Sequence, residues 1–409
     1  MRYNTKTLAS GLRVIHLPST SSVVYCGFQI AAGTRDEQLG EEGLAHFCEH
    51  MTFKGTQRRH ALQIINALEV LGGELNAFTN KESTVYYAAV QKEHLKVAVD
   101  VLADMVFHSQ YPQAEVEREV EVICDEIESY NDSPAELIYD EFENLLFDGH
   151  PLGHNILGSA EQLRTYTTAD AQRYTSRHYL PMKSVFFVYG DVDFRRLVAL
   201  LEKLVPKVAS ESPMAPTTSK ELPTFPAGET IVRHRNTHQA HVMIGTRAYH
   251  ANHPRRMALF LLNNLIGGPG MNSRLNLVLR ERHGLVYTVE STTVNYGDTG
   301  VWSVYFGCDP HDVTRCRRLV RRELDKLMEK PLSDSRLSIA KRQLKGQLAI
   351  ACDSHEQFAL DFGKSFLFDG KERDLDGLFR KIDSVTVGEL HDVACELFPP
   401  ERLMTLVYR

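Results

Sequence analysis

The chain has 409 residues, enough for about two domains, and its hydrophobic and charged contents of 43% and 24% are ordinary for a globular protein. The formal net charge of −7 argues against nonspecific nucleic-acid binding, which requires a basic surface. No apolar run approaches the roughly 18 residues of a membrane-spanning helix. We therefore expect neither nucleic acid nor a membrane among the partners.

The N-terminal residues lack the apolar core of a signal peptide, so export would require a signal outside this sequence. The seven cysteines are odd in number and include no C-x-x-C pair, which disfavours a disulfide framework and a cysteine-based zinc site. Reduced thiols are usual in the cytosol. We expect a cytoplasmic protein.

Two strand-like runs, at 12–17 and 23–30, precede an apolar stretch that reads LAHFCEHM at 44–51. At about 100° per helical residue, His46, Glu49 and His50 point within an arc of about 100°. Histidines four residues apart can hold one metal ion, and H-x-x-E-H reverses the H-E-x-x-H order of many zinc enzymes. A catalytic zinc takes three protein ligands. A buried, hydrogen-bonded polar cluster is the alternative unless a third ligand exists.

Residues 72–89 are typical of a β-hairpin, and 112–129 of a helix. An apolar stripe on this helix consists of Val116, Val120, Ile123 and Ile127. The solvated face consists of Glu117, Glu121, Asp125 and Glu128. Glu119 and Glu126 fall between Val122 and Ile123, on the inward flank. A buried carboxylate without a partner is costly, so this pair indicates a cation. The alternative is that both carboxylates reach water or an arginine.

A stretch rich in proline, serine and threonine at 206–229 predicts a linker between an N-terminal domain, 1–205, and a C-terminal domain, 230–409. Residues 131–149 align without gaps with 352–370, with seven of nineteen positions identical at an offset of 221. This indicates a duplication, although two similar amphipathic helices would also explain it. At that offset Glu119 and Glu126 correspond to Ala340 and Gln347, and the second half has no H-x-x-E-H. We expect a metal site in the first half alone.

The sequence resembles the pitrilysin/insulinase family of zinc peptidases, particularly the branch of the mitochondrial processing peptidases and their bacterial relatives. The stretches that carry the resemblance are GLAHFCEHMTFKGT (43–56), LGGELNAFTNKESTVYY (71–87), EREVEVICDEI (117–127) and GMNSRLNLVLRERHGLVYTV (270–289). The match runs nearly end to end. It implies an α+β fold of two homologous domains, each a mostly antiparallel sheet with helices packed against it.

The resemblance also implies the metal site. It makes Glu126 the third ligand, beside His46 and His50, of one Zn²⁺ per chain. Glu119 then supports the site from behind the ligands. Glu49 would be the base that takes a proton from water and passes it to the leaving amine.

Substrate contacts follow from the same resemblance. Asn76, Ala77 and Phe78 would belong to an edge strand to which an extended peptide adds by main-chain hydrogen bonds. An ordinary hairpin strand explains them equally well. In the C-terminal domain, Arg280 and Tyr287 match the family's arginine and tyrosine pair, and Tyr287 would hydrogen-bond the carbonyl oxygen in the transition state.

We therefore expect a zinc-dependent metalloendopeptidase that hydrolyses peptides or unstructured polypeptide segments. Because one chain carries both the metal motif and the Arg/Tyr pair, we expect a homodimer with two complete sites. The alternative is a non-catalytic or partner-dependent subunit of a processing-peptidase-like assembly, but the expected ligands are all present here. A structural zinc site is disfavoured because such sites usually have four ligands, many of them cysteine.

Overall fold

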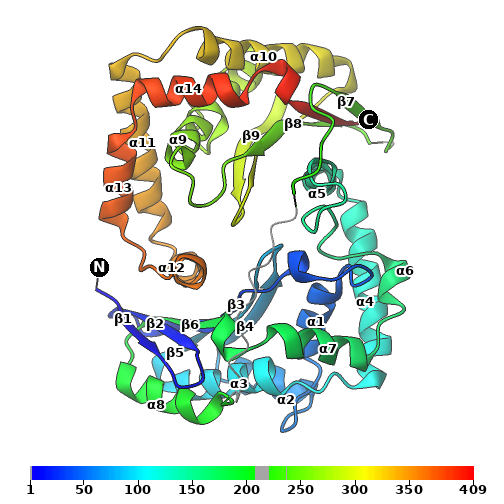
Figure 1. Ribbon diagram of the computed structural model, residues 1–409, viewed down its shortest axis with the longest axis vertical. Helices are drawn as coiled ribbons and strands as arrows, with labels where there is room; N and C mark the ends of the chain where they lie inside the picture. Colours follow the sequence, from blue (N-terminus) through cyan, green and yellow to red (C-terminus); the bar gives the residue numbers. More distant parts are fainter. Residues whose placement is uncertain (1, 208–220, 236) are drawn as a thin grey trace. The chain divides into compact units, whose positions relative to one another are not determined.

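The computed structural model describes residues 2–207, 221–235 and 237–409 (Figure 1), so residues 208–220 of the expected linker lie outside the described residues. The described chain forms two compact units. The first unit comprises residues 2–128, 154–207 and 351–374. The second comprises residues 129–153, 221–235, 237–350 and 375–409.

The first unit contains a six-stranded sheet with the order β1-β2-β6-β3-β5-β4. The strands are β1 (Asn4–Thr7), β2 (Arg13–Pro18), β3 (Val23–Ile30), β4 (Glu74–Thr79), β5 (Thr84–Gln91) and β6 (Ser184–Gly190). Neighbouring strands are antiparallel except β2 and β6. The helices are α1 (Leu44–Thr52), α2 (Ala61–Glu69), α3 (Leu95–His108), α4 (Gln113–Asn131), α6 (Ala160–Leu163), α7 (Thr168–His178), α8 (Phe194–Leu204) and α12 (His355–Asp369).

Helices cover both faces of this sheet, with α12 on one side and α3 and α8 on the other (Figure 1). Successive side chains of a strand point to opposite faces. Phe28 of β3 accordingly packs edge-on against Phe107 of α3, with ring centroids 5.2 Å apart. The next residue, Gln29, points the other way, and its Nε2 donates to the carbonyl of Leu360 in α12 at 2.8 Å.

The second unit contains a five-stranded sheet with the order β7-β11-β8-β10-β9. Its strands are β7 (Thr230–Arg233), β8 (Ala240–Ala248), β9 (Val286–Asn295), β10 (Gly300–Cys308) and β11 (Met404–Tyr408). Its helices are α5 (Pro134–Leu146), α9 (Arg256–Gly267), the π-helix η4 (Asn276–Arg282), α10 (Val313–Glu329), α11 (Asp334–Ala351), α13 (Leu375–Ser384) and α14 (Val387–Leu397). Among the strands described in this unit, β7 and β11 are parallel and the other neighbours are antiparallel.

The order and directions of these five strands repeat those of β2-β6-β3-β5-β4. This repetition supports the duplication inferred from the sequence. The prediction of an α+β fold with two mostly antiparallel sheets is confirmed. Within residues 2–207, 221–235 and 237–409, no helix combines the length and the apolar character needed to cross a bilayer.

The two duplicated helices are exchanged between the units. Helix α5 comes from the first half of the sequence but packs on β8 and β11, and α12 comes from the second half but packs on β3 and β6. An arginine of each sheet caps the end of the exchanged helix. Arg13 Nη1 donates to the Phe366 carbonyl at 2.9 Å, and Arg247 Nε donates to the Leu146 carbonyl at 2.9 Å. The compact units therefore differ by one segment each from the ranges 1–205 and 230–409, which remain our proposal for the homologous halves.

Candidate metal centre

Helix α1 carries the H-x-x-E-H motif, and the chain immediately before the helix holds its N-terminus in place. Both Glu37 oxygens accept hydrogen bonds there, from the backbone N–H of Gly43 at 3.1 Å and of Ala45 at 2.7 Å. A carboxylate is favourable at this end of a helix. Burial raises the pKa of Glu37 to about 7, against the lowering effect of hydrogen bonds from His154, Ala45 and Gly43. Eight of the nine residues of α1 are buried, so the motif sits on a rigid element.

Gly43 is the residue on which this turn depends. Its φ of +87° is in the left-handed region, and a Cβ there would lie 2.7 Å from the Leu157 carbonyl oxygen and 2.8 Å from Gly158 Cα. Gly40 has a similar φ of +84° but no neighbour within 4 Å. We expect Gly43→Ala to lower the free energy of unfolding by about 2–4 kcal/mol, and the matched control Gly40→Ala by about 1 kcal/mol. Urea unfolding measures both, and equal losses would contradict the role of crowding at Gly43.

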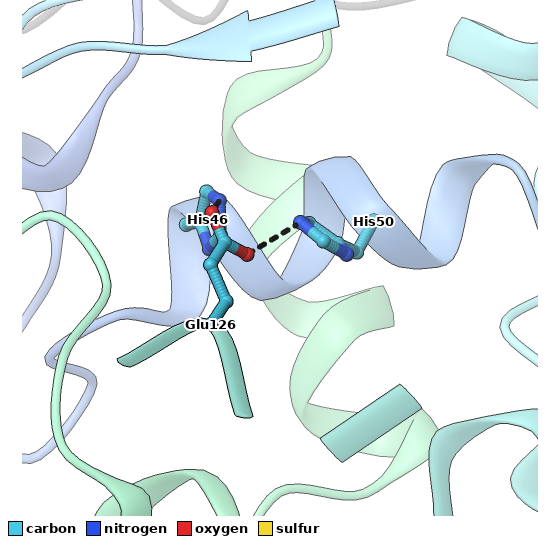
Figure 2. Close-up of side chains that lie close together, drawn as sticks. All are labelled: His46, His50 and Glu126. Carbon is cyan, nitrogen blue, oxygen red and sulfur yellow. Dashed lines mark ion pairs between the residues drawn. The ribbon is translucent and has the colours of Figure 1, made fainter. Parts of the chain in front are cut away.

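Three ligand atoms from two helices converge beside α1 (Figure 2). Glu126 of α4 lies beside His46 and His50, and one candidate ligand atom from each residue lies within 4.8 Å of the other two. Nε2 of His50 is 3.4 Å from Glu126 Oε2, and Nε2 of His46 is 3.9 Å from Glu126 Oε1. The Glu126 side chain is 44% exposed, whereas that of His46 is buried. The cluster is therefore open to solvent on the side of Glu126.

Glu119 lies behind the cluster and orients one of the imidazoles. Its Oε1 is 2.9 Å from Nδ1 of His50, and its Oε2 is 2.6 Å from Nζ of Lys54. When Nδ1–H of His50 donates a hydrogen bond to Glu119, the lone pair of Nε2 faces Glu126. A carboxylate in this position is usual behind a metal-binding histidine, because it sets the tautomer and the ring orientation.

The charges around the two histidines favour a cation. Burial, then the neighbouring His50, lowers the pKa of His46 to about 4, which keeps its imidazole neutral. Burial also lowers the pKa of His50, but hydrogen bonds to Glu119 and Glu126 outweigh it and raise the pKa to about 9. Carboxylates that stabilise a positive charge on His50 would stabilise a metal ion at the same place.

Zinc fits this donor set. Two imidazole nitrogens and one carboxylate oxygen are the ligands of many catalytic zinc sites. Bonds of about 2.0–2.1 Å in a tetrahedral arrangement place ligand atoms roughly 3.3 Å apart. The separations of 3.4 and 3.9 Å between the nitrogens and the carboxylate are close to that spacing.

Glu49 lies next to the candidate ligands, but its side chain makes a different contact. Its Oε2 accepts a hydrogen bond from Thr79 Oγ1, at the end of β4, at 2.6 Å. Among the described residues, its Oε1 accepts no hydrogen bond. Burial raises the pKa of Glu49, while Thr79 and the charge of His50 lower it. The arrangement leaves one carboxylate oxygen available beside the cluster.

The burial of residues on helix α4 agrees only in part with the faces predicted from the sequence on a helical wheel. The solvated face is confirmed, because Glu117, Glu121, Asp125 and Glu128 are all exposed. Val122, which the wheel placed on the inward flank, is 51% exposed. Glu119 is buried, but Glu126 lies at the rim because the apolar face narrows towards the C-terminal end of the helix. The reason for a cation is therefore the convergence of Glu126 with the histidines, and not the cost of burying its carboxylate.

The expected substrate contacts fall in both units. Asn76, Ala77 and Phe78 lie in β4, which is the edge strand of the first sheet and packs against α1. Arg280 and Tyr287 belong to the second unit, where the Arg280 guanidinium lies 5.5 Å from the centroid of the Tyr287 ring. Tyr287 is 82% exposed there. A role of this pair in peptide hydrolysis stays a prediction.

Two residues that contact the candidate site, Lys54 and Thr79, were not predicted from the sequence. Lys54 lies beyond the end of α1, and its contact with Glu119 of α4 joins residues that no local spacing relates. Thr79 was part of the expected hairpin, but no sequence signal links it to Glu49, because the contact depends on how β4 packs against α1.

The chain matches two family models, "Insulinase (Peptidase family M16)" over residues 13–160 and "Peptidase M16 inactive domain" over residues 165–344. An uncharacterized zinc protease of Bacillus subtilis is 32% identical over 98% of this chain and 97% of its own length. The mitochondrial-processing peptidase subunit beta of Saccharomyces cerevisiae is 29% identical over 94% of this chain and 86% of its own.

Solved structures share the fold at lower identity. A protease from Helicobacter pylori has a TM-score of 0.89 and 23% identity, covering 100% of this chain and 99% of that one. A peptidase M16 inactive domain protein from Pseudomonas fluorescens has a TM-score of 0.90 and 18% identity, covering 100% and 98%. At these identities the structures establish the fold alone.

Proposed function

The chain belongs to the insulinase family of peptidases, peptidase family M16, and we propose that it is a zinc-dependent endopeptidase that hydrolyses peptides or unstructured polypeptide segments. Relatives that share about a third of its residues are named zinc proteases, which supports a metallopeptidase. The observation that carries the proposal is the convergence of His46, His50 and Glu126, with Glu119 behind His50.

His46, His50 and Glu126 would hold one zinc ion per chain. When bound, zinc supplies Lewis acidity towards a carbonyl oxygen and towards water. Glu49 would act as the general base. Thr79 holds Oε2 of Glu49, so Oε1 would take the proton of the attacking water and then give it to the nitrogen of the leaving amine.

Substrate would bind along β4. An edge strand has unpaired main-chain groups on one side, and an extended peptide can add to it by main-chain hydrogen bonds. We propose that the stretch Asn76, Ala77 and Phe78 receives the peptide in this way, which the contact between β4 and α1 supports. Tyr287 would donate a hydrogen bond to the carbonyl oxygen as negative charge develops on it, with Arg280 beside the ring.

Zinc dependence can be tested by metal analysis paired with cleavage of a random peptide library. We expect about one zinc ion per chain, loss of cleavage with a chelator, and recovery when zinc is added back. The chelator already saturated with zinc, added in place of the free chelator, is the control for nonspecific inhibition. A zinc-free chain with undiminished cleavage would contradict the proposal.

The chain would act as a homodimer with two complete sites, because it carries both the metal motif and the Arg/Tyr pair. Sedimentation under assay conditions should show the activity with the dimer. A stable, active monomer would contradict this.

A partner-dependent subunit is the second candidate, favoured by the yeast relative that is named as a subunit. In that case the purified chain would bind zinc but cleave nothing in the library.

We also propose a cytoplasmic location. All seven cysteines are free thiols, which supports a reducing compartment. Cell fractionation checks this, and recovery of the protein outside the cytoplasm would contradict it.

A further inference from the structure

The second unit contains a pocket of about 340 Å³ beside α10, formed by residues of that unit alone. Three neighbouring residues of the sheet contribute to its floor. Thr405 of β11 pairs in register with Thr230 of β7 on one side and with Ile244 of β8 on the other. Side chains at paired positions point to the same face of a sheet. The floor therefore presents two hydroxyl groups and one apolar side chain.

The wall contributed by α10 is strongly basic. Thr314, Arg317, Arg318 and Arg321 line the pocket and follow the spacing of one helix face. Residues 313–322 contain five arginines and no acidic residue. Positive side chains near the N-terminus of a helix oppose the helix dipole and repel one another. A bound anion would relieve this repulsion.

The arginines of the pocket are poorly compensated. Arg317 Nη2 donates to Thr230 Oγ1 at 2.7 Å, but neither Arg317 nor Arg318 forms an ion pair with any described residue. Burial lowers the pKa of Arg317, as expected for a desolvated cation. Arg321 Nε donates to Asp325 at 2.8 Å and Nη1 to the Phe398 carbonyl at 2.6 Å. Its Nη2 is buried and has no hydrogen-bond partner among the described residues.

We infer that this pocket binds a small phosphate monoester with an apolar or aromatic body. The guanidinium groups of Arg317 and Arg318, which have no carboxylate partner among the described residues, match the charge of a dianionic phosphate. The planar guanidinium fork also suits the phosphate oxygens. Val320, Leu324 and Leu403 provide apolar walls for the body of the ligand. The volume is at the lower end of the range for small-molecule sites. This binding is separate from peptide hydrolysis, which the proposed function assigns to residues of α1 and α4.

Calorimetry on the full chain with four probes tests the ligand class. The probes differ in their charge or in their apolar body. Phenyl phosphate carries both the dianion and the apolar body. Benzoate has the same body with a single charge, inorganic phosphate has the charge alone, and benzyl alcohol has the body alone. We expect phenyl phosphate to bind at least about tenfold more tightly than each of the others, and to weaken as salt increases. Absent binding at millimolar concentration, or benzoate binding equally well, would overturn the inference.

Variants of α10 locate the site. Arg317→Gln and Arg321→Gln should weaken phenyl phosphate binding by roughly 10–100-fold. Arg322→Gln is the matched control, because Arg322 is exposed on the same helix and does not line the pocket. Arg321 also bonds to Phe398, so Arg317→Gln decides the result if Arg321→Gln fails to fold. Binding that is unchanged in a folded Arg317→Gln chain would overturn the inference, since it would place the phosphate elsewhere, for example at a metal ion.

Discussion

Glu49→Gln is expected to retain about one zinc ion per chain and to hydrolyse peptides at least about 10²-fold more slowly than the wild type. The amide oxygen of glutamine can still accept the hydrogen bond from Thr79, and the two side chains have nearly the same volume. The buried surroundings of this position should therefore survive the change. What is lost is the oxygen that can hold a proton.

Both halves of this prediction need measuring on the same preparation: kcat with a quenched fluorescent peptide, and zinc by elemental analysis. Glu117→Gln is the control, because Glu117 is exposed on the solvated face of α4 and should change neither quantity. Full activity in Glu49→Gln would remove Glu49 from the role of base. Loss of zinc instead of loss of rate would identify it as a ligand.

Glutamine substitutions along α4 should separate a ligand from its support. Glu126→Gln should lower zinc affinity by more than about 10²-fold, because it removes the one anionic ligand of the three. Glu119→Gln should lower it by about 10–100-fold, since this residue acts through Nδ1 of His50. Glu128→Gln, two residues beyond Glu126 and exposed, should leave the affinity unchanged.

Competition with a chromophoric chelator measures these affinities at fixed pH. The order of the three variants is the informative result, because misfolding would not grade the loss according to distance from the histidines. Equal affinities for Glu126→Gln and Glu128→Gln would show that Glu126 is not a ligand. Hydrolysis at limiting zinc should follow the same order.

The second unit repeats the strand arrangement of the first unit but not its candidate metal ligands. Its five strands have the order and directions of the first sheet, and α11 corresponds to α4 at the offset of the duplication. On α11 the positions of Glu119 and Glu126 hold Ala340, which is buried in the core, and Gln347. Alanine has no donor atom and an amide carries no negative charge, so this helix lacks the carboxylates that we propose for the metal site on α4. A family model described as an inactive domain matches residues 165–344, which include the position of Ala340.

The spacing of residues along the sequence was enough to predict several helices and strands and the side chains that share one face of α1. The common direction of His46, Glu49 and His50 depends only on the spacing of residues along one helix, and α1 reproduces it. Strand β3 begins and ends where the strand-like run of the sequence predicted it, at Val23 and Ile30. These features involve residues close in the chain, so the geometry of a single helix or strand determines them.

The contacts within the candidate site depend on tertiary packing, because packing brings together residues that no local pattern relates. The wheel placed Glu119 and Glu126 on the same flank of α4, and only the way α4 packs against α1 directs one to Nδ1 of His50 and the other to Nε2. The exposure of Val122 and the exchange of α5 and α12 between the sheets have the same origin. Helical spacing specifies which side chains share a face, whereas the partner of that face depends on contacts that form only when distant segments meet.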